Sequence, residues 1–451
     1  MNKSLIRKYN VPGPRYTSYP TVPYWDETPP TEEQWKGKVK ATYQNSRKEG
    51  LSIYIHLPYC ESLCTYCGCN TRITVNHAVE EPYINTLLKE WQMYLDVLGE
   101  APLIKEIHLG GGTPTFFSPK NLQRLISTIV RSGKVGSDTE MGFEAHPNNT
   151  TAEHMQVLYD LGFRRISLGI QDFDPEVQKI VNRIQPFEKV KEVTELARAM
   201  GYTSVNFDLI YGLPKQSAET VADTINKTIR LMPDRIAFYS YAHVPWMKPA
   251  QKKFEAYLPT NEVKRNLYEL GKNMLEEQGY YEIGMDHFAL KTDSLYIASQ
   301  EGRLHRNFMG YSTNATKLLI GLGASSISDT WTAFGQNIKS VEPYMKRVNE
   351  GHLPIYRGHL LTDEDLMVRQ HILNIMCRSY TEWHKESAEA EVLHVAMDRL
   401  KEMAEDRIVQ LDEEAIKVYD HGKPFIRNVC MALDARMWRK KPESAIFSST
   451  I

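Results

Sequence analysis

LSIYIHLPYCESLCTYCGC, residues 51–69, joins a run typical of a buried strand to a loop that carries four cysteines. Cys60, Cys64 and Cys67 place three thiols within eight residues, and Cys69 adds a fourth. This clustering indicates a metal centre, because a disulfide framework spreads its cysteines along the chain. Iron–sulfur clusters are held by cysteine thiolates. The stretch therefore predicts a cluster bound on a loop at the carboxyl end of a strand.

Two other kinds of thiol site account for part of this motif. A structural zinc site usually needs two ligand pairs separated by a longer loop, and no second pair appears here. A redox-active C-x-x-C pair uses two thiols and leaves Cys60 and Cys69 unexplained. The iron–sulfur interpretation accounts for more of the motif than either alternative.

Around this stretch, short β-rich runs alternate with longer segments of helical periodicity, the pattern of repeated βα units around a parallel sheet. Six such steps are fewer than the eight of a closed barrel, so the sequence predicts an α/β fold, a partial (β/α)6 barrel. The expected strands are Leu51–His56, Ile104–Leu109, Glu140–Ala145, Arg165–Ile170, Ser204–Ile210 and Arg235–Tyr241. The expected helices are Glu81–Leu98, Pro119–Arg131, Ala152–Leu161, Pro175–Arg198 and Ala218–Leu231.

The length of 451 residues exceeds what one hydrophobic core usually fills. We expect an N-terminal arm or lid over 1–50, a catalytic partial barrel with its extension over 51–355, and a small C-terminal domain, mainly helical or winged, over 356–451. The arm is expected from the Pro- and Tyr-rich segment 11–25, which lacks periodicity. A strand pair at Ile408–Leu411 and Ala415–Val418 is expected in the C-terminal domain.

Composition narrows the class of protein. Apolar residues make up 42% and charged residues 24%, values typical of a soluble globular chain. The net charge of -2 provides no overall basic field for nucleic acid. No run of about 18 apolar residues is present, and the basic N-terminus is not followed by an apolar one. We expect a cytoplasmic protein that acts as a monomer and binds neither nucleic acid nor a membrane.

Noteworthy polar residues fall at the ends of the expected strands. Glycines at 110–112 allow a ligand to approach the backbone closely, although a tight turn alone also explains them. Glu144 ends the next strand, where its carboxylate can accept hydrogen bonds from an ammonium group or a ribose hydroxyl. Tyr54 and His56 alternate along the first strand and therefore face one side of the sheet. The carboxyl edge of the sheet is the expected site of chemistry.

The C-x-x-x-C-x-x-C spacing of the first three cysteines resembles the hallmark of the radical S-adenosylmethionine superfamily. Further segments resemble one branch of it, the oxygen-independent coproporphyrinogen III oxidase family, and together they cover nearly the whole chain. These segments are RYTSYPT from Arg15, HLPYCESLCTYCGCNT from His56, GGGTPT from Gly110, DLIYGLPKQ from Asp208, GMDHFA from Gly284 and HRNFMGY from His305.

The resemblance implies one [4Fe-4S] cluster, with Cys60, Cys64 and Cys67 on three irons and S-adenosylmethionine on the fourth. It also implies two molecules of S-adenosylmethionine, with Tyr54 at the first and Tyr66 near the second. The cofactor-binding residues that it implies are Tyr54, Tyr66, Gly111, Gly112, Thr113, Glu144, Gln171, Arg183, Asp208, Ala242 and Ile327. Tyr54, Glu144 and Cys69 are the catalytic candidates. The chain departs from many relatives at His146, where they carry an acidic residue.

The activity implied is oxidative decarboxylation of two propionates of coproporphyrinogen III to vinyl groups, giving protoporphyrinogen IX in anaerobic haem synthesis. An electron donor and an electron acceptor are required, and the sequence identifies neither. A substrate with four carboxylates needs cationic donors. Arg15, Arg72, Arg303 and Arg306 are the candidates, and each is equally explained as a packing or surface residue.

Three other functions stay open at this point. A haem-delivering chaperone of the same superfamily lacks the decarboxylation, and its relatives usually lack Cys69 and the RYTSYPT arm. A radical methyltransferase that opens the haem ring would consume haem under reducing conditions. A zinc-stabilised scaffold would be colourless after anaerobic purification.

Overall fold

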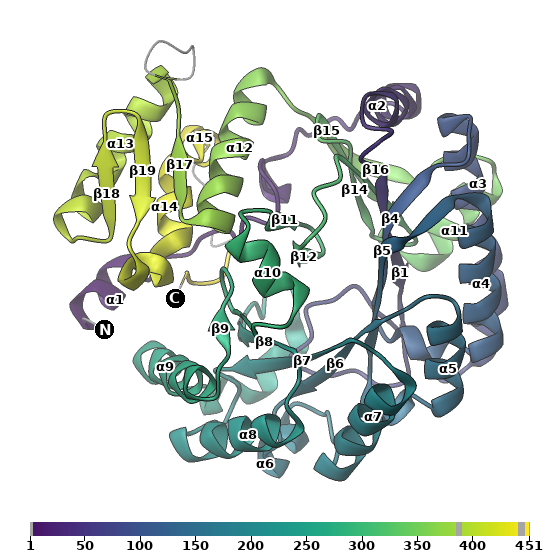
Figure 1. Cartoon of the computed structure of the whole chain (residues 1–451), viewed down its shortest axis with the longest axis horizontal. Coiled ribbons are helices and arrows are strands. Elements are labelled where there is room, and N and C mark those ends of the chain that lie inside the picture. Colours follow the sequence, from purple (N-terminus) through teal and green to yellow (C-terminus); the bar gives the residue numbers. More distant parts are fainter. Residues whose placement is uncertain (1–2, 385–389, 441–446, 451) are drawn as a thin grey trace.

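The computed structural model describes residues 3–384, 390–440 and 447–450 (Figure 1). Six parallel strands form the centre of its largest sheet and lie side by side in chain order. They are β1 (Leu51–Leu57), β4 (Leu103–Gly111), β5 (Lys134–Ala145), β6 (Arg165–Gln171), β7 (Ser204–Tyr211) and β8 (Arg235–Ser240). The six strands expected from the sequence are confirmed.

The connecting helices lie outside the curved sheet (Figure 1). They are α3 (Glu80–Leu98), α4 (Pro119–Ser132), α5 (Ala152–Asp160), α6 (Pro175–Ile180), α7 (Phe187–Met200) and α8 (Ala218–Leu231). The single helix expected over Pro175–Arg198 is wrong, because it is divided into α6 and α7. Asn182 adopts a φ of 54°, and Pro186 caps α7 without a backbone N–H to continue a helix.

Additional strands extend the sheet at both ends. Next to β1 lies β13 (Leu318–Leu322), which is parallel to it, followed by antiparallel β14 (Ile327–Asp329), β15 (Ala333–Asn337) and β16 (Ile355–Leu360). Next to β8 lie antiparallel β10 (His287–Ala289) and β9 (Tyr281–Glu282). The sheet has two unjoined ends, β16 and β9, so the barrel is partial, as expected.

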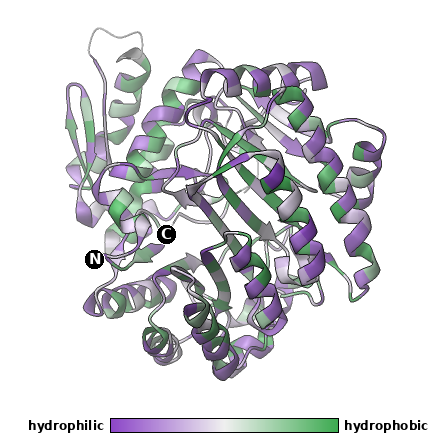
Figure 2. Ribbon diagram, turned by 45° about the vertical axis from the view of Figure 1, so that its right-hand side comes forward, coloured by the Kyte–Doolittle hydropathy of each residue, from purple (hydrophilic) through white to green (hydrophobic). Residues whose placement is uncertain are grey.

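Alternation along the strands divides the sheet into two faces. In β1, Ile53 and Ile55 are fully buried in the main core, whereas Tyr54 and His56 face the barrel interior. Trp91 of α3 packs in the same core. Figure 2 shows hydrophobic colours concentrated in the strands and hydrophilic colours on the outer helices. The apolar face holds the helices, which leaves the interior face free for polar residues.

The first 50 residues contribute to two cores. The helix α2 (Glu32–Asn45) begins at a capping box on Thr31 and buries Trp35 in the main core. The helix α1 (Lys3–Tyr9) buries Ile6 in a second core, together with Tyr16 and Tyr19 of the intervening segment. That second core belongs otherwise to the C-terminal elements. The segment between the two helices therefore connects the barrel to the C-terminal part of the chain.

The C-terminal elements surround a three-stranded antiparallel sheet in the order β17–β19–β18. They are α12 (Asp363–Arg378), β17 (Tyr380–Glu382), α13 (Ala390–Glu405), β18 (Val409–Asp412), β19 (Ala415–Val418), α14 (Ile426–Leu433) and α15 (Ala435–Arg439). The strand pair expected here is confirmed, shifted by one residue at β18.

The remaining elements connect the barrel to these parts. They are β2 (Tyr59–Cys60), β3 (Arg72–Ile73), α9 (Asn261–Glu277), α10 (Ser294–Gln300), β11 (His305–Asn307), β12 (Gly310–Ser312) and α11 (Val341–Asn349). A helix able to cross a membrane, which needs length and apolar character together, is not found among the described residues.

Candidate active site

A cavity of about 500 Å³ opens at the carboxyl edge of the parallel strands. All four cysteines of the loop after β1 line it. Residues from the following strands and loops share its wall: Gly111, Gly112, Thr113, Glu144, Gln171, Arg183 and Asp208. The fold thus brings together most of the cofactor-binding candidates, which span about 150 residues of sequence. We refer to this space as the thiol cavity.

Each of the three predicted ligand thiols has a polar neighbour. The Thr113 hydroxyl lies 3.4 Å from Cys60 Sγ, and Arg183 Nη1 lies 3.5 Å from Cys64 Sγ. The backbone N–H of Cys69 donates to Cys67 Sγ over 3.4 Å. The contact with Cys69 lowers the pKa of the Cys67 thiol to about 6, whereas burial raises the pKa of Cys60 to about 11.

Three thiols from one loop around a shared cavity fit the ligand set of an iron–sulfur cluster. Across residues 3–384, 390–440 and 447–450, no three Cys, His, Asp or Glu side chains converge as ligands of a single metal ion. The family assignment and the sulfur donors carry the cluster assignment here.

The glycines after β4 are required by close backbone contacts. Gly111 has a φ of 114°, which other residues rarely adopt. A side chain at Gly112 would lie 2.7 Å from the backbone carbon of Pro58. The turn therefore lets β4 run directly against the cysteine loop.

Glu144 is held at the centre of the site. Its carboxylate accepts the backbone N–H of Gly111 over 3.2 Å and lies 3.6 Å from Nε2 of His108. Burial acts to raise the pKa of Glu144, but the His108 and Gly111 contacts outweigh burial and lower it below its usual value. The group therefore remains an anion at neutral pH.

Asp208 faces the same cavity from β7. It accepts hydrogen bonds from Ser167 Oγ over 2.8 Å and from Asn206 Nδ2 over 2.9 Å. Burial, followed by the charge of Glu144, raises the pKa of Asp208 to about 6. Two carboxylates with opposite pKa shifts thus lie in one cavity.

Arg183 and Gln171 complete the far wall of the thiol cavity. Arg183 donates through Nη2 to the carbonyl of Gly169 over 2.5 Å, and its buried Nε has no partner among the described residues. Gln171 has a φ of 69°, at a register shift between β6 and β7. Such a local irregularity redirects a side chain at the end of a strand. Burial lowers the pKa of neighbouring His146 to about 3, so this departure from many relatives adds a neutral ring to the wall.

A smaller cavity of about 210 Å³ adjoins the first and shares Glu144 with it. Tyr54 and Ile327 line this smaller space, together with His56 and His108. Tyr66 and Ala242 lie together elsewhere, because Gln251 Nε2 donates to the carbonyls of both, over 3.1 Å and 3.3 Å. Tyr66 lines the thiol cavity, whereas Ala242 does not line either space.

Sequence reasoning missed two residues of the site. His108 stacks on Tyr54 at 18° and faces Glu144, and Tyr239 lines the thiol cavity from β8. Period-two alternation would have found His108, which precedes Gly110 by two residues on the same face of β4.

The four arginines considered for the substrate carboxylates are dispersed. Arg72 pairs with Glu342 over 2.9 Å, and Arg303 pairs with Glu301, both at the surface. Arg15 and Arg306 are close together, since Arg306 Nη2 donates to the Arg15 carbonyl over 3.3 Å. None of the four lines the thiol cavity.

Comparison with known proteins gives consistent results. The model of the Radical SAM superfamily matches residues 54–228. A Helicobacter pylori protein named oxygen-independent coproporphyrinogen III oxidase is 38% identical over 435 residues, covering 95% of each chain. The protein of that name from Escherichia coli K12 is 36% identical over 460 residues, covering 99% of this chain and 98% of the relative.

A solved structure extends the likeness to the fold. The structure described as coproporphyrinogen III oxidase from Escherichia coli, a radical SAM enzyme, superposes with a TM-score of 0.89 at 34% identity. The match covers 96% of this chain and 98% of that one.

Proposed function

The chain belongs to the oxygen-independent coproporphyrinogen III oxidases of the radical SAM superfamily, and from this membership we infer its reaction. It converts two propionate side chains of coproporphyrinogen III to vinyl groups with loss of carbon dioxide, giving protoporphyrinogen IX in anaerobic haem synthesis. The observation that carries this conclusion is the thiol cavity, in which three loop thiols share a wall with Glu144, Arg183 and Asp208.

Cys60, Cys64 and Cys67 are the residues that would hold the [4Fe-4S] cluster. When bound, the cluster and S-adenosylmethionine supply the 5′-deoxyadenosyl radical that takes a hydrogen atom from the β-carbon of a propionate. The chain itself orients these groups and excludes competing reactants. The contact of Arg183 with Cys64 and that of Thr113 with Cys60 support this orienting role.

We assign Glu144 to binding S-adenosylmethionine through its ammonium group or ribose. The lowered pKa of Glu144 supports this role, because an anion is the better acceptor for charged and hydroxyl donors. The glycines 111 and 112, which bring the backbone to the cavity, support an approach of the methionine end. Gln171, Arg183 and Asp208 line the opposite wall and are assigned to the cofactor on the same grounds.

Two molecules of S-adenosylmethionine are proposed, one for each propionate. The two adjoining cavities that share Glu144 support this number. Tyr54 and Ile327 line the smaller cavity, and we assign them to the first molecule. Tyr66 lines the larger one and shares Gln251 with Ala242, and we assign this pair to the second.

Cys69 and Tyr54 are proposed as catalytic residues beside Glu144. Cys69 lines the thiol cavity next to the ligand loop, and Tyr54 lies between His56 and His108. We further propose that the protein acts as a cytoplasmic monomer and exchanges electrons with a separate donor and acceptor.

The decisive experiment uses reconstituted protein under anaerobic conditions with dithionite, S-adenosylmethionine and coproporphyrinogen III. We expect two molecules of carbon dioxide for each divinyl product, detected by mass and fluorescence. A Cys64→Ser variant should form no product. Release of no carbon dioxide by the wild type, or consumption of haem in its place, would contradict the proposal.

A further inference from the structure

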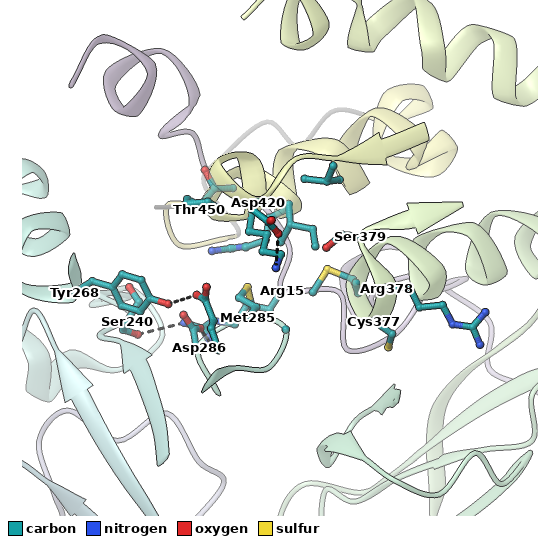
Figure 3. Close-up of a pocket in the computed structure, with 18 of the residues that line it drawn as sticks. Arg15, Ser240, Tyr268, Met285, Asp286, Cys377, Arg378, Ser379, Asp420 and Thr450 are labelled. Atoms are coloured by element: carbon teal, nitrogen blue, oxygen red, sulfur yellow. Dashed lines mark hydrogen bonds and ion pairs between the residues drawn. The ribbon is translucent and has the colours of Figure 1, made fainter. Parts of the chain in front are cut away.

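A second cavity of about 500 Å³ lies between the β8–β10 end of the sheet and the C-terminal elements (Figure 3). Four separate parts of the chain form its wall. Arg15 comes from the N-terminal segment, Ser240 from the end of β8, Asp286 from the turn before β10, and Arg427 from α14. We call this space the interdomain cleft, and none of the functions assigned above uses it.

Positive charge predominates in the cleft. Six lining residues are basic and three are acidic: Arg15, Arg265, Arg378, Lys417, Lys423 and Arg427 against Glu282, Asp286 and Asp420. Two of the acidic groups already have cationic partners, since Asp420 lies 2.9 Å from Lys423 and Glu282 lies 2.5 Å from Lys272. Among the described lining residues, this leaves Asp286 as the counter-charge for the deeper arginines.

Arg427 is a buried cation whose partners are uncharged. It is 4% exposed, and it donates to the carbonyls of Pro14 and Ser449 over 2.8 and 2.9 Å and to that of Gly13. Within the described part of the chain, no carboxylate lies at ion-pair distance from it. Burial lowers its pKa to about 9. A buried charge of this kind is stabilised by an anion.

Arg15 and Lys264 add to the same excess. Arg15 Nη1 lies 3.3 Å from Asp286 Oδ2, and its Nη2 donates to the carbonyl of Ser240 over 3.3 Å. Lys264 donates to the carbonyl of Tyr241 over 2.7 Å, and burial followed by the charge of Arg15 lowers its pKa to about 8. Three cations thus surround Asp286, which can neutralise one of them.

The rest of the cleft wall is aromatic and apolar. Tyr211, Tyr268, Met285 and Met376 line it beside the cations. The site adjoins the thiol cavity along the chain, because Tyr239 lines that cavity and the next residue, Ser240, lines the cleft. A ligand for the cleft should therefore combine a carboxylate with an apolar body.

We propose that the interdomain cleft binds a carboxylate group between Arg15 and Arg427. Resting on the proposed function, the inferred source is a propionate of the porphyrinogen that does not react. Only two of the four propionates lose carbon dioxide, so the other two carboxylates remain charged and need cationic partners. A guanidinium group suits this ligand, since its planar donors match a carboxylate. A free small carboxylate has the same chemistry and is the other source to test.

The experiment measures binding of coproporphyrin III, the unreactive oxidised porphyrin, and of citrate to the reconstituted protein. An Arg15→Gln variant should raise the Kd for coproporphyrin III about tenfold, the usual order for a lost charged hydrogen bond. An Asp286→Asn variant should lower that Kd, because it removes the competing carboxylate. Arg303→Gln, a surface arginine outside the cleft, serves as the matched control and should leave the Kd unchanged.

The opposite signs of the two variants separate charge from packing. If both Arg15→Gln and Asp286→Asn weaken binding, or neither changes the Kd for either probe, the proposal is overturned. If only the Kd for citrate responds with the expected signs, the carboxylate site stands and its ligand is a free carboxylate. Product formation by the wild type is assayed separately, so failure of the proposed function is distinguished from failure of the cleft.

Discussion

Nε2 of His108 lies 3.6 Å from Oε1 of Glu144, and Nδ1 of the same ring is buried with no partner among the described residues. The imidazole therefore faces the carboxylate with one nitrogen only. Glu144 also accepts the Gly111 N–H, so both donors favour its ionised form. This pair connects the two cavities of the site, because Glu144 lines both of them.

Replacement of Glu144 by Gln should weaken binding of S-adenosylmethionine about tenfold or more, because a charged acceptor is lost. The cluster should still assemble, since Glu144 supplies no thiolate. Equilibrium binding and iron analysis on the same sample measure the two effects. Glu176→Gln, which removes an exposed partner of Lys215, is the control and should change neither. Unchanged affinity in Glu144→Gln would rule out the cofactor role.

The pH dependence of cofactor binding should reflect Asp208. Its raised pKa of about 6 means that the folded protein protonates this group as the pH falls through that value. Protonation removes a negative charge near a cationic cofactor, so affinity should decrease by up to about tenfold between pH 7 and pH 5. Glu144 has a lowered pKa and should remain ionised throughout.

Titration calorimetry at several pH values measures this step, and the cluster absorbance checks that the iron is retained. An Asp208→Asn variant should bind weakly at every pH and lose the step. Persistence of the step in that variant would assign it to another group.

Serine substitutions should divide the four loop cysteines into two classes. Cys60→Ser, Cys64→Ser and Cys67→Ser should each lose most of the bound iron and all activity, since thiolates hold the cluster. Cys69→Ser should keep the iron, because its contact with Cys67 is made by a backbone N–H that serine also has. Activity should fall in Cys69→Ser despite the intact cluster. Iron and sulfide analysis beside the vinyl assay tests this, and iron loss in Cys69→Ser would make it a ligand.

The amino end of the barrel should affect stability rather than chemistry. Asp293 and Arg235 form a buried ion pair at 2.6 Å, and Ser204 donates to the same carboxylate over 2.9 Å. Asp293→Ala leaves the guanidinium unpaired and should cost about 3–5 kcal/mol of folding free energy. Asp223→Ala, which removes an exposed partner of Lys227, should cost less than about 1 kcal/mol.

Urea unfolding midpoints compare the two variants, and the Kd for S-adenosylmethionine should be unchanged in both. A loss of affinity in Asp293→Ala without a lower midpoint would contradict this separation of roles.

The sequence alone determined the features that depend on local pattern. The six strands and the cysteine loop were predicted because alternation, helical spacing and thiol clustering are properties of neighbouring residues. The sequence also identified the family, through motifs that remain contiguous along the chain. The division at Pro186 and the position of His108 were within reach of the same rules but were missed.

Only the tertiary structure decided which distant residues meet. β13 pairs with β1 across more than 250 residues of chain, and Arg15, Asp286 and Arg427 meet in one cleft. These contacts come from packing of whole elements, which no local period encodes. The opposite pKa shifts of Glu144 and Asp208 have the same origin, because burial and neighbouring charges exist only after the chain has folded.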